Sequence, residues 1–124
     1  MSIVAITLSL LLIGGSACCD NEVAKEIFSP NATHRAVVFN RGCGATTGFN
    51  TEISILGSSE GLHGSGNLWV ADDSGDSPSG SWGGPDVHLR WLSQDTLEVQ
   101  FASGLRVFKQ EGRVDGITAV YVQR

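Results

Sequence analysis

Apolar and polar residues alternate in a series of short runs along the second half of the chain. Residues 51–56 place Ile53 and Ile55 on one face, and residues 87–92 place Leu89 and Trp91 on one face. Alternation of this kind is typical of a β-strand with one buried side. Five further runs alternate or are rich in β-branched and aromatic residues: residues 35–40, 67–71, 96–101, 105–109 and 117–122. The pattern predicts an all-β fold, a small antiparallel sandwich or barrel of about six or seven strands.

The connections between these runs divide into short and long ones. Ser93-Gln94-Asp95, Ala102-Ser103-Gly104 and Asp115-Gly116 have the length and residue types of hairpin turns. Residues 57–66 and 74–84 are rich in Gly and Ser and exceed the usual hairpin length. We interpret both long stretches as mobile surface linkers, and loops that carry binding residues are the alternative.

The N-terminus begins with an apolar run. Residues 3–13 are apolar except for Thr7 and Ser9, and small residues occupy positions 14–17. About 20 apolar residues are needed to span a bilayer, so this run is too short, but its length suits the apolar region of a signal peptide. We therefore expect three parts: a signal peptide over residues 1–17, a tether over residues 18–30 and the β domain over residues 31–124.

Cys18 directly follows the small residues. This junction resembles the lipobox of bacterial lipoproteins, in which the signal is cut before a cysteine whose thiol receives a diacylglycerol. The resemblance implies that Cys18 is the lipidation site and that the lipid anchors the protein to a membrane of the cell envelope. A secretory signal cut near Ala17 and a retained membrane anchor are the alternatives, and each of the three exports the domain.

Two further cysteines remain if Cys18 is acylated. An oxidising envelope permits Cys19 and Cys43 to form a disulfide, which would tie the tether to the first hairpin loop. Two free thiols are the alternative. The sequence has no Cys-x-x-Cys motif and no metal-ligand spacing of cysteines, so it predicts neither redox catalysis nor a cysteine-based zinc site.

Charge and length exclude several classes of protein. The 124 residues include 8 Lys and Arg against 13 Asp and Glu, which gives a net charge of -5. Nucleic acid is disfavoured as a partner, because binding a polyanion requires a basic patch. The chain is also shorter than the roughly 200 residues that TIM barrels and most other large enzyme folds need.

The sequence motifs that suggest catalysis or metal binding are weak. Ser59 lies in a G-x-S-x-G match, but no helical pattern follows it, as an α/β-hydrolase would need. Residues 72–76 are acidic but do not match a calcium-binding loop. The three histidines lie in separate segments without metal-ligand spacing: His34, His63 and His88. We therefore predict no catalytic residue, no metal and no cofactor, and the protein is not expected to be an enzyme.

Trp82 lies in a Gly- and Ser-rich stretch, without alternating neighbours. It either is exposed, where tryptophan commonly anchors a partner, or folds back onto one end of the sheet. The candidate partner-binding residues are Trp82 and three residues of the first hairpin loop: Ala45, Thr46 and Thr47.

Four segments of the chain carry a resemblance to known proteins. They are Ser29-Pro30-Asn31, Gly42-Cys43-Gly44-Ala45-Thr46-Thr47, Gly83-Gly84-Pro85 and Arg90-Trp91-Leu92-Ser93-Gln94-Asp95-Thr96-Leu97. Together with the N-terminus, this series resembles a group of small bacterial exported proteins and lipoproteins of unknown function. Their pattern is an S-P-[DN] turn, a strand, a G-A-T segment and a late W-[IL]-x-x-[DN]-x-[VL] hairpin, and it covers roughly residues 29–100. The resemblance implies an exported β domain and carries over no catalytic residue.

These observations lead to one functional hypothesis and one alternative. We expect a non-enzymatic lipoprotein module that is tethered to the envelope and binds an unidentified envelope protein or glycan, not nucleic acid. The alternative is a secreted or periplasmic inhibitor of a hydrolase of the lysozyme or protease type. Its negative charge would steer it toward a basic enzyme.

Overall fold

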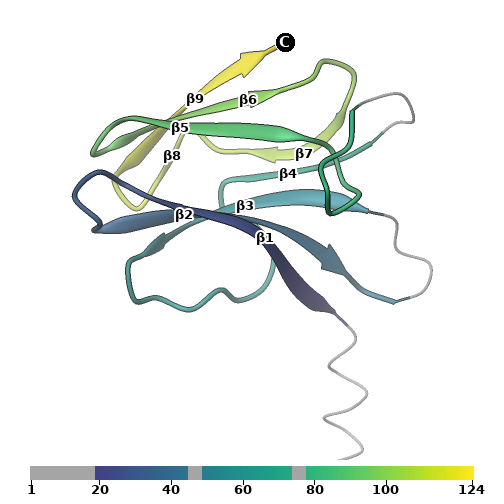
Figure 1. The fold of residues 1–124 in the computed structure, drawn as a ribbon, viewed down its shortest axis with the longest axis horizontal. Helices are drawn as coiled ribbons and strands as arrows, with labels where there is room; N and C mark the ends of the chain where they lie inside the picture. The colour runs from purple at the N-terminus through teal and green to yellow at the C-terminus, as the bar shows by residue number, and fades with distance from the viewer. Residues whose placement is uncertain (1–18, 45–48, 74–77) are drawn as a thin grey trace, which may run out of the picture.

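The computed structural model describes residues 19–44, 49–73 and 78–124 (Figure 1). Over these residues the chain is all-β, with nine strands and no helix. The strands are β1 (Asp20–Phe28), β2 (His34–Gly42), β3 (Asn50–Gly57), β4 (Trp69–Asp72), β5 (Val87–Ser93), β6 (Thr96–Phe101), β7 (Arg106–Gln110), β8 (Arg113–Val114) and β9 (Ile117–Gln123). The expected signal peptide over residues 1–17 lies outside the described residues.

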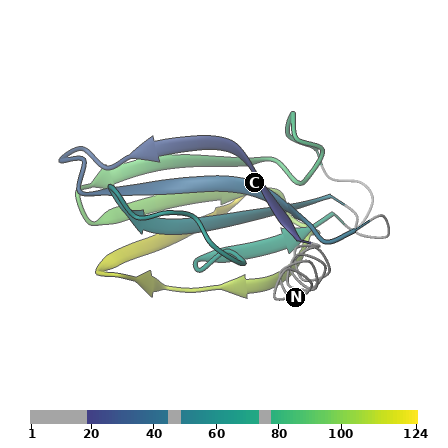
Figure 2. The ribbon, with the colours of Figure 1, turned by 90° about the horizontal axis from the view of Figure 1, so that it is seen from below.

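The strands form two sheets that pack face to face as a sandwich (Figures 1 and 2). One sheet has the order β1-β2-β3-β4-β7 and the other has the order β5-β6-β9-β8. The all-β sandwich prediction is confirmed. Neighbouring strands are antiparallel except for β6 and β9, which are parallel. This exception arises because the chain leaves β6 for the other sheet, forms β7 there, and returns through β8.

The connection through Ala102-Ser103-Gly104 is therefore not a hairpin turn. It carries the chain from β6 in one sheet to β7 in the other. Gly104 has a φ of 89°, a conformation that glycine adopts without strain. The other two turns are hairpins, between β5 and β6 and between β8 and β9. Asp115 and Gly116 both have positive φ, as a two-residue type I′ turn requires.

The prediction of a tether over residues 18–30 is wrong for Asp20–Phe28, which forms the edge strand β1 and pairs with β2. A bulge between Val23 and Lys25 shifts the register of this pair. Val23 consequently lies opposite Phe39 and Ile27 lies opposite Ala36, on the other face of the sheet. The two apolar residues thus face opposite sides although four positions separate them, and the alternation that marks a strand is lost.

The main core lies between the two sheets, where both contribute their inward-facing side chains. Trp69 of β4 is fully buried, and its ring centroid lies 5.2 Å from that of Phe101 of β6. The other buried members are Ala36, Val38, Ile53, Ile55, Leu68, Ala71, Val87, Leu97, Val99 and Ile117. The alternation that predicted β3 and β6 is the alternation between this core and the outer faces.

A second, smaller core lies on the outer face of the first sheet. Residues 58–67, which we call the strap, run across this face (Figures 1 and 2). Leu62 of the strap packs against buried Val37, Phe39 and Leu56. The interpretation of residues 57–66 as a mobile linker is therefore wrong, because the strap covers apolar residues that would otherwise be in water.

Polar contacts also hold the strap in place. The carboxylate of Glu52, which is buried, accepts hydrogen bonds from Ser65 Oγ at 2.9 Å and from the backbone N–H of Gly66 at 2.7 Å. The side chain of Asn67 bonds both the N–H and the C=O of Ile55, at 2.8 and 2.9 Å. Asn67 therefore replaces a strand neighbour for β3 at this position.

Two side chains join the open edges of the two sheets. Lys25 of β1 donates from Nζ to the carbonyl of Val87 at 2.7 Å, and Trp91 of β5 donates from Nε1 to the carbonyl of Ile27 at 3.1 Å. A lysine that points inward from an edge strand also hinders the addition of a further strand.

Candidate functional site

The sandwich has two ends that differ in chemistry. Strand register places the start of β1, the connection between β2 and β3, and the connection between β4 and β5 at one end, which we call the proximal end. Its described connecting residues are Cys19, 43–44, 49, 73, 78–86 and 102–105. The turns at residues 29–33, 94–95 and 115–116 lie at the other end, which we call the distal end (Figure 1).

A disulfide joins Cys19 to Cys43 at the proximal end. Their Cα atoms lie 3.9 Å apart, and the neighbouring residues Asp20 and Gly42 are partners in the β1–β2 ladder. The bridge therefore links the residue before β1 to the residue after β2. Cys18, the expected lipidation site, lies outside the described residues and directly precedes the bridge.

Trp82 is half-buried and packs against the main core. Its Nε1 donates a hydrogen bond to Thr51 Oγ1 at 2.8 Å, and the ammonium of Lys25 lies 5.7 Å from the centroid of its ring. Its ring lies so close over Gly80 that a Cβ there would come within 2.3 Å of it. Of the two alternatives, the structure shows the indole folded back onto the sheet. The other partner-binding candidates, Ala45, Thr46 and Thr47, lie outside the described residues.

Phe49 is the most exposed aromatic residue at the proximal end, with 62% of its surface accessible. Its ring rests on Gly83, because a Cβ at Gly83 would lie 2.9 Å from the ring. Sequence analysis missed Phe49. The sequence feature that could have identified Phe49 is the position of an aromatic residue outside the alternating run of residues 51–56.

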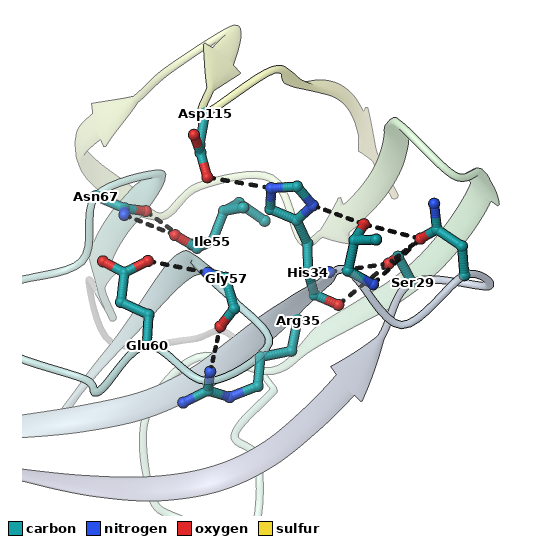
Figure 3. Close-up of polar contacts among 10 residues, drawn as sticks. Ser29, His34, Arg35, Ile55, Gly57, Glu60, Asn67 and Asp115 are labelled. Atoms are coloured by element: carbon teal, nitrogen blue, oxygen red, sulfur yellow. Dashed lines mark hydrogen bonds and ion pairs between the residues drawn. The ribbon is translucent and has the colours of Figure 1, made fainter.

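At the distal end, His34 bridges the two sheets (Figure 3). His34 begins β2, and its Nε2 lies 3.1 Å from Oδ2 of Asp115 in the β8–β9 turn. The positive φ of Asp115, 51°, is part of the turn that presents its carboxylate toward the histidine. The side chain of Asp115 is 63% exposed.

Asn31 makes a second link between the sheets at the distal end. Its Nδ2 donates to Oε1 of Gln94 in the β5–β6 turn. Its Oδ1 accepts from Ser29 Oγ at 3.0 Å and from the N–H and hydroxyl of Thr33 at 3.2 and 2.9 Å. Bonds of this kind between an asparagine side chain and the residue two positions later define an Asx turn and fix its shape.

Arg35 ties β2 to the end of β3, where the strap begins. Its Nη1 donates to the carbonyl of Gly57 at 2.6 Å (Figure 3). Its Nε lies 3.2 Å from Oε2 of Glu26. Glu60 accepts from the N–H of Gly57 at 2.9 Å. Side-chain bonds within and between the sheets therefore connect the three distal turns and the junction between β3 and the strap.

A chain of hydrogen bonds runs from Thr33 through His34 to Asp115. Thr33 Oγ1 lies 3.0 Å from Nδ1 of His34, whose other ring nitrogen faces Asp115. A hydroxyl, an imidazole and a carboxylate in this order also occur in nucleophilic catalysis. Here the same hydroxyl bonds Asn31 within the Asx turn. The Thr33 hydroxyl thus takes part in ordering the turn at residues 29–33, and the His34–Asp115 contact joins this end of β2 to the β8–β9 turn.

The remaining sequence candidates lie apart from one another. His88 is exposed and pairs with Asp86 at 3.0 Å, and Asp72 binds Arg106 through both carboxylate oxygens, at 2.7 and 2.9 Å. Ser59 is exposed in the turn after β3. In the part of the chain that the structure describes, no three His, Cys, Asp or Glu residues gather as a metal site would require.

Comparisons of the chain with protein-family models, with curated proteins and with solved structures found no match. The resemblance to exported bacterial proteins stays a prediction. No helix over residues 19–44, 49–73 and 78–124 has the length and apolar character needed to cross a membrane.

Proposed function

We propose that the chain is an exported lipoprotein whose β-sandwich serves as a non-enzymatic binding module at the bacterial cell envelope. The observation that carries the proposal is the disulfide between Cys19 and Cys43, directly after Cys18. Disulfides persist in oxidising compartments and are rare in the cytosol, so the bridge supports export. The small residues before Cys18 support its acylation.

The distal end is the surface that best suits a partner. Its turns are held by the pairs Asn31–Gln94 and His34–Asp115. Side chains that are already ordered lose little conformational entropy when a partner binds. The exposed amide and carboxylate groups there favour a polar partner, an envelope protein or glycan.

Intact-mass measurement of the mature protein, recovered from fractionated cells of its host, tests the anchor. We expect a diacylglycerol-sized increment on Cys18 in the membrane fraction and no increment in a Cys18→Ala control. An unmodified, soluble chain would contradict the proposal. The same spectra, recorded with and without reductant, report the Cys19–Cys43 bridge.

Site-specific photo-crosslinking tests the binding surface. A photoreactive amino acid at Leu92, an exposed residue beside the β5–β6 turn at the distal end, is compared with one at Phe108, an exposed residue of the edge strand β7. We expect a discrete product in envelope preparations only from position 92. The same product from both positions, or from position 108 alone, would contradict a distal binding surface. The inhibitor alternative differs in its partner, so purified lysozymes and proteases assayed for inhibition at micromolar concentration separate the two.

A further inference from the structure

Almost no chain separates the expected lipid from the folded domain. β1 begins at Asp20, so Cys19 alone stands between Cys18 and the first strand. One residue spans at most about 3.6 Å, and Cys19 is also held by its bridge to Cys43. A diacylglycerol on Cys18 therefore lies at the proximal end itself.

The surface of the proximal end suits a lipid bilayer. Phe49 is 62% exposed, and the other side of its ring rests on Gly83, which fixes the direction in which it projects. Phe, like Trp and Leu, is found on apolar faces that are buried at the boundary between lipid headgroups and acyl chains. An exposed aromatic residue at the same end of the sandwich as the lipid would add a second point of attachment to the bilayer.

Two carboxylates of the proximal end are paired with arginines. Arg106 neutralises Asp72 through two hydrogen bonds, and Arg124 lies 4.0 Å from Asp86. Pairing reduces the repulsion that exposed carboxylates would experience near an anionic membrane surface.

We propose that the proximal end is a membrane-contact surface and that Phe49 enters the interfacial region of the bilayer. The proposal rests on the proposed function, because it requires the lipid on Cys18. The partner is the lipid surface, and the sandwich stands on it end-on. The nine residues of β2 then hold the distal end about 30 Å from the membrane, at a rise of roughly 3.3 Å per residue. Trp82 accordingly lies at the membrane side, while Asn31, Gln94 and Asp115 face the compartment.

Fluorescence quenching in vesicles tests this orientation. The lipidated mature protein is reconstituted into phosphatidylcholine vesicles whose acyl chains carry bromine, a contact quencher of tryptophan. Phe49→Trp is compared with Phe28→Trp, which replaces an exposed phenylalanine at the distal end of β1. The unsubstituted protein supplies the background of the three native tryptophans. We expect a loss of the added emission for Phe49→Trp and none for Phe28→Trp.

The other outcomes overturn the inference in distinguishable ways. Equal quenching of both variants would show a sandwich that lies on its side, and no quenching of either would show a domain held clear of the bilayer. In both cases the measured mass still includes the lipid on Cys18, so the proposed function is not contradicted. If the measured mass shows no lipid on Cys18, both this inference and the proposed function are contradicted. Near-ultraviolet circular dichroism, matched to the unsubstituted protein, verifies that both variants are folded.

Discussion

The hydroxyl of Thr51 connects two parts of the loop before β5. It accepts a hydrogen bond from Nε1 of Trp82 at 2.8 Å and donates its own proton to the carbonyl of Pro85. Thr51 is fully buried on β3, so both bonds form away from water. One side chain of the first sheet thereby holds the described residues of this loop against the proximal end.

Replacement of Thr51 by valine should destabilise the protein, although the two side chains have the same shape. Valine leaves the Trp82 N–H and the Pro85 carbonyl without their partner, at a cost of about 1 to 3 kcal/mol in the free energy of unfolding. Urea unfolding followed by tryptophan fluorescence measures this loss. Thr51→Ser keeps the hydroxyl and should retain more of the stability than Thr51→Val, and the reverse order would contradict the role assigned to the hydroxyl.

Gly84 marks a second close contact of the same loop with β3. A Cβ at this position would lie 2.1 Å from the carbonyl oxygen of Asn50 and 2.8 Å from Thr51 Oγ1. Gly84→Ala should therefore lower the free energy of unfolding by about 2 to 3 kcal/mol, since overpacking forces the backbone to move. Gly112→Ala is the matched control, because no atom lies within 4 Å of a Cβ there. Equal unfolding midpoints for the two variants would contradict this account.

The alternating or β-rich runs of the sequence predicted seven of the nine described strands. In β5 and β6 the alternation reflects one buried face. β1 was missed because its bulge moves Val23 and Ile27 to opposite faces. β8 was missed because a strand of two residues, Arg113–Val114, is too short to show a period. The parallel pairing of β6 with β9 depends on the order of strands in space, which alternation does not encode.

The side-chain contacts of the distal end were predictable only in part. The sequence indicated turns at Asn31 and at Asp115-Gly116, but the pairing of His34 with Asp115 joins residues separated by 81 positions. The position of the strap likewise depends on contacts between residues that are distant in sequence. Its Gly and Ser content is also typical of a mobile linker, and the buried carboxylate of Glu52 that holds it lies outside the strap, on β3.

The Cys19–Cys43 bridge, which supports export of the protein, should also stabilise the fold. The two cysteines are 24 positions apart, and closing a loop of this size in the unfolded chain corresponds to about 3 kcal/mol. The double variant Cys19→Ser, Cys43→Ser, made in a chain that starts at residue 19, should lose about this amount in urea unfolding. Reduction of the unsubstituted chain should give the same loss. If reduction left the unfolding midpoint unchanged, the bridge would have no stabilising role.

The ionisation of Tyr121 should make the free energy of unfolding depend on alkaline pH. Burial raises the pKa of its phenol above the ordinary value, and the nearby charge of Glu111 raises the pKa further. The phenol also donates to the backbone carbonyl of Glu111 at 2.7 Å, and this bond requires the proton. The folded protein therefore keeps the proton at a pH where the unfolded chain releases it.

The sign of the effect follows from proton linkage. The contribution of Tyr121 to stability is fully present below the unfolded pKa of about 10 and is lost as pH rises from there toward the folded pKa. Tyr121 is the single tyrosine of the chain, so tyrosinate absorbance reports it alone: titration in the native state should occur at higher pH than in guanidinium. Tyr121→Phe should cost about 1 kcal/mol at neutral pH. The variant should also lose stability less steeply above pH 10 than the unsubstituted protein. An identical alkaline slope in both proteins would show that the phenol is not the group responsible, because the lysines that also titrate there are common to both.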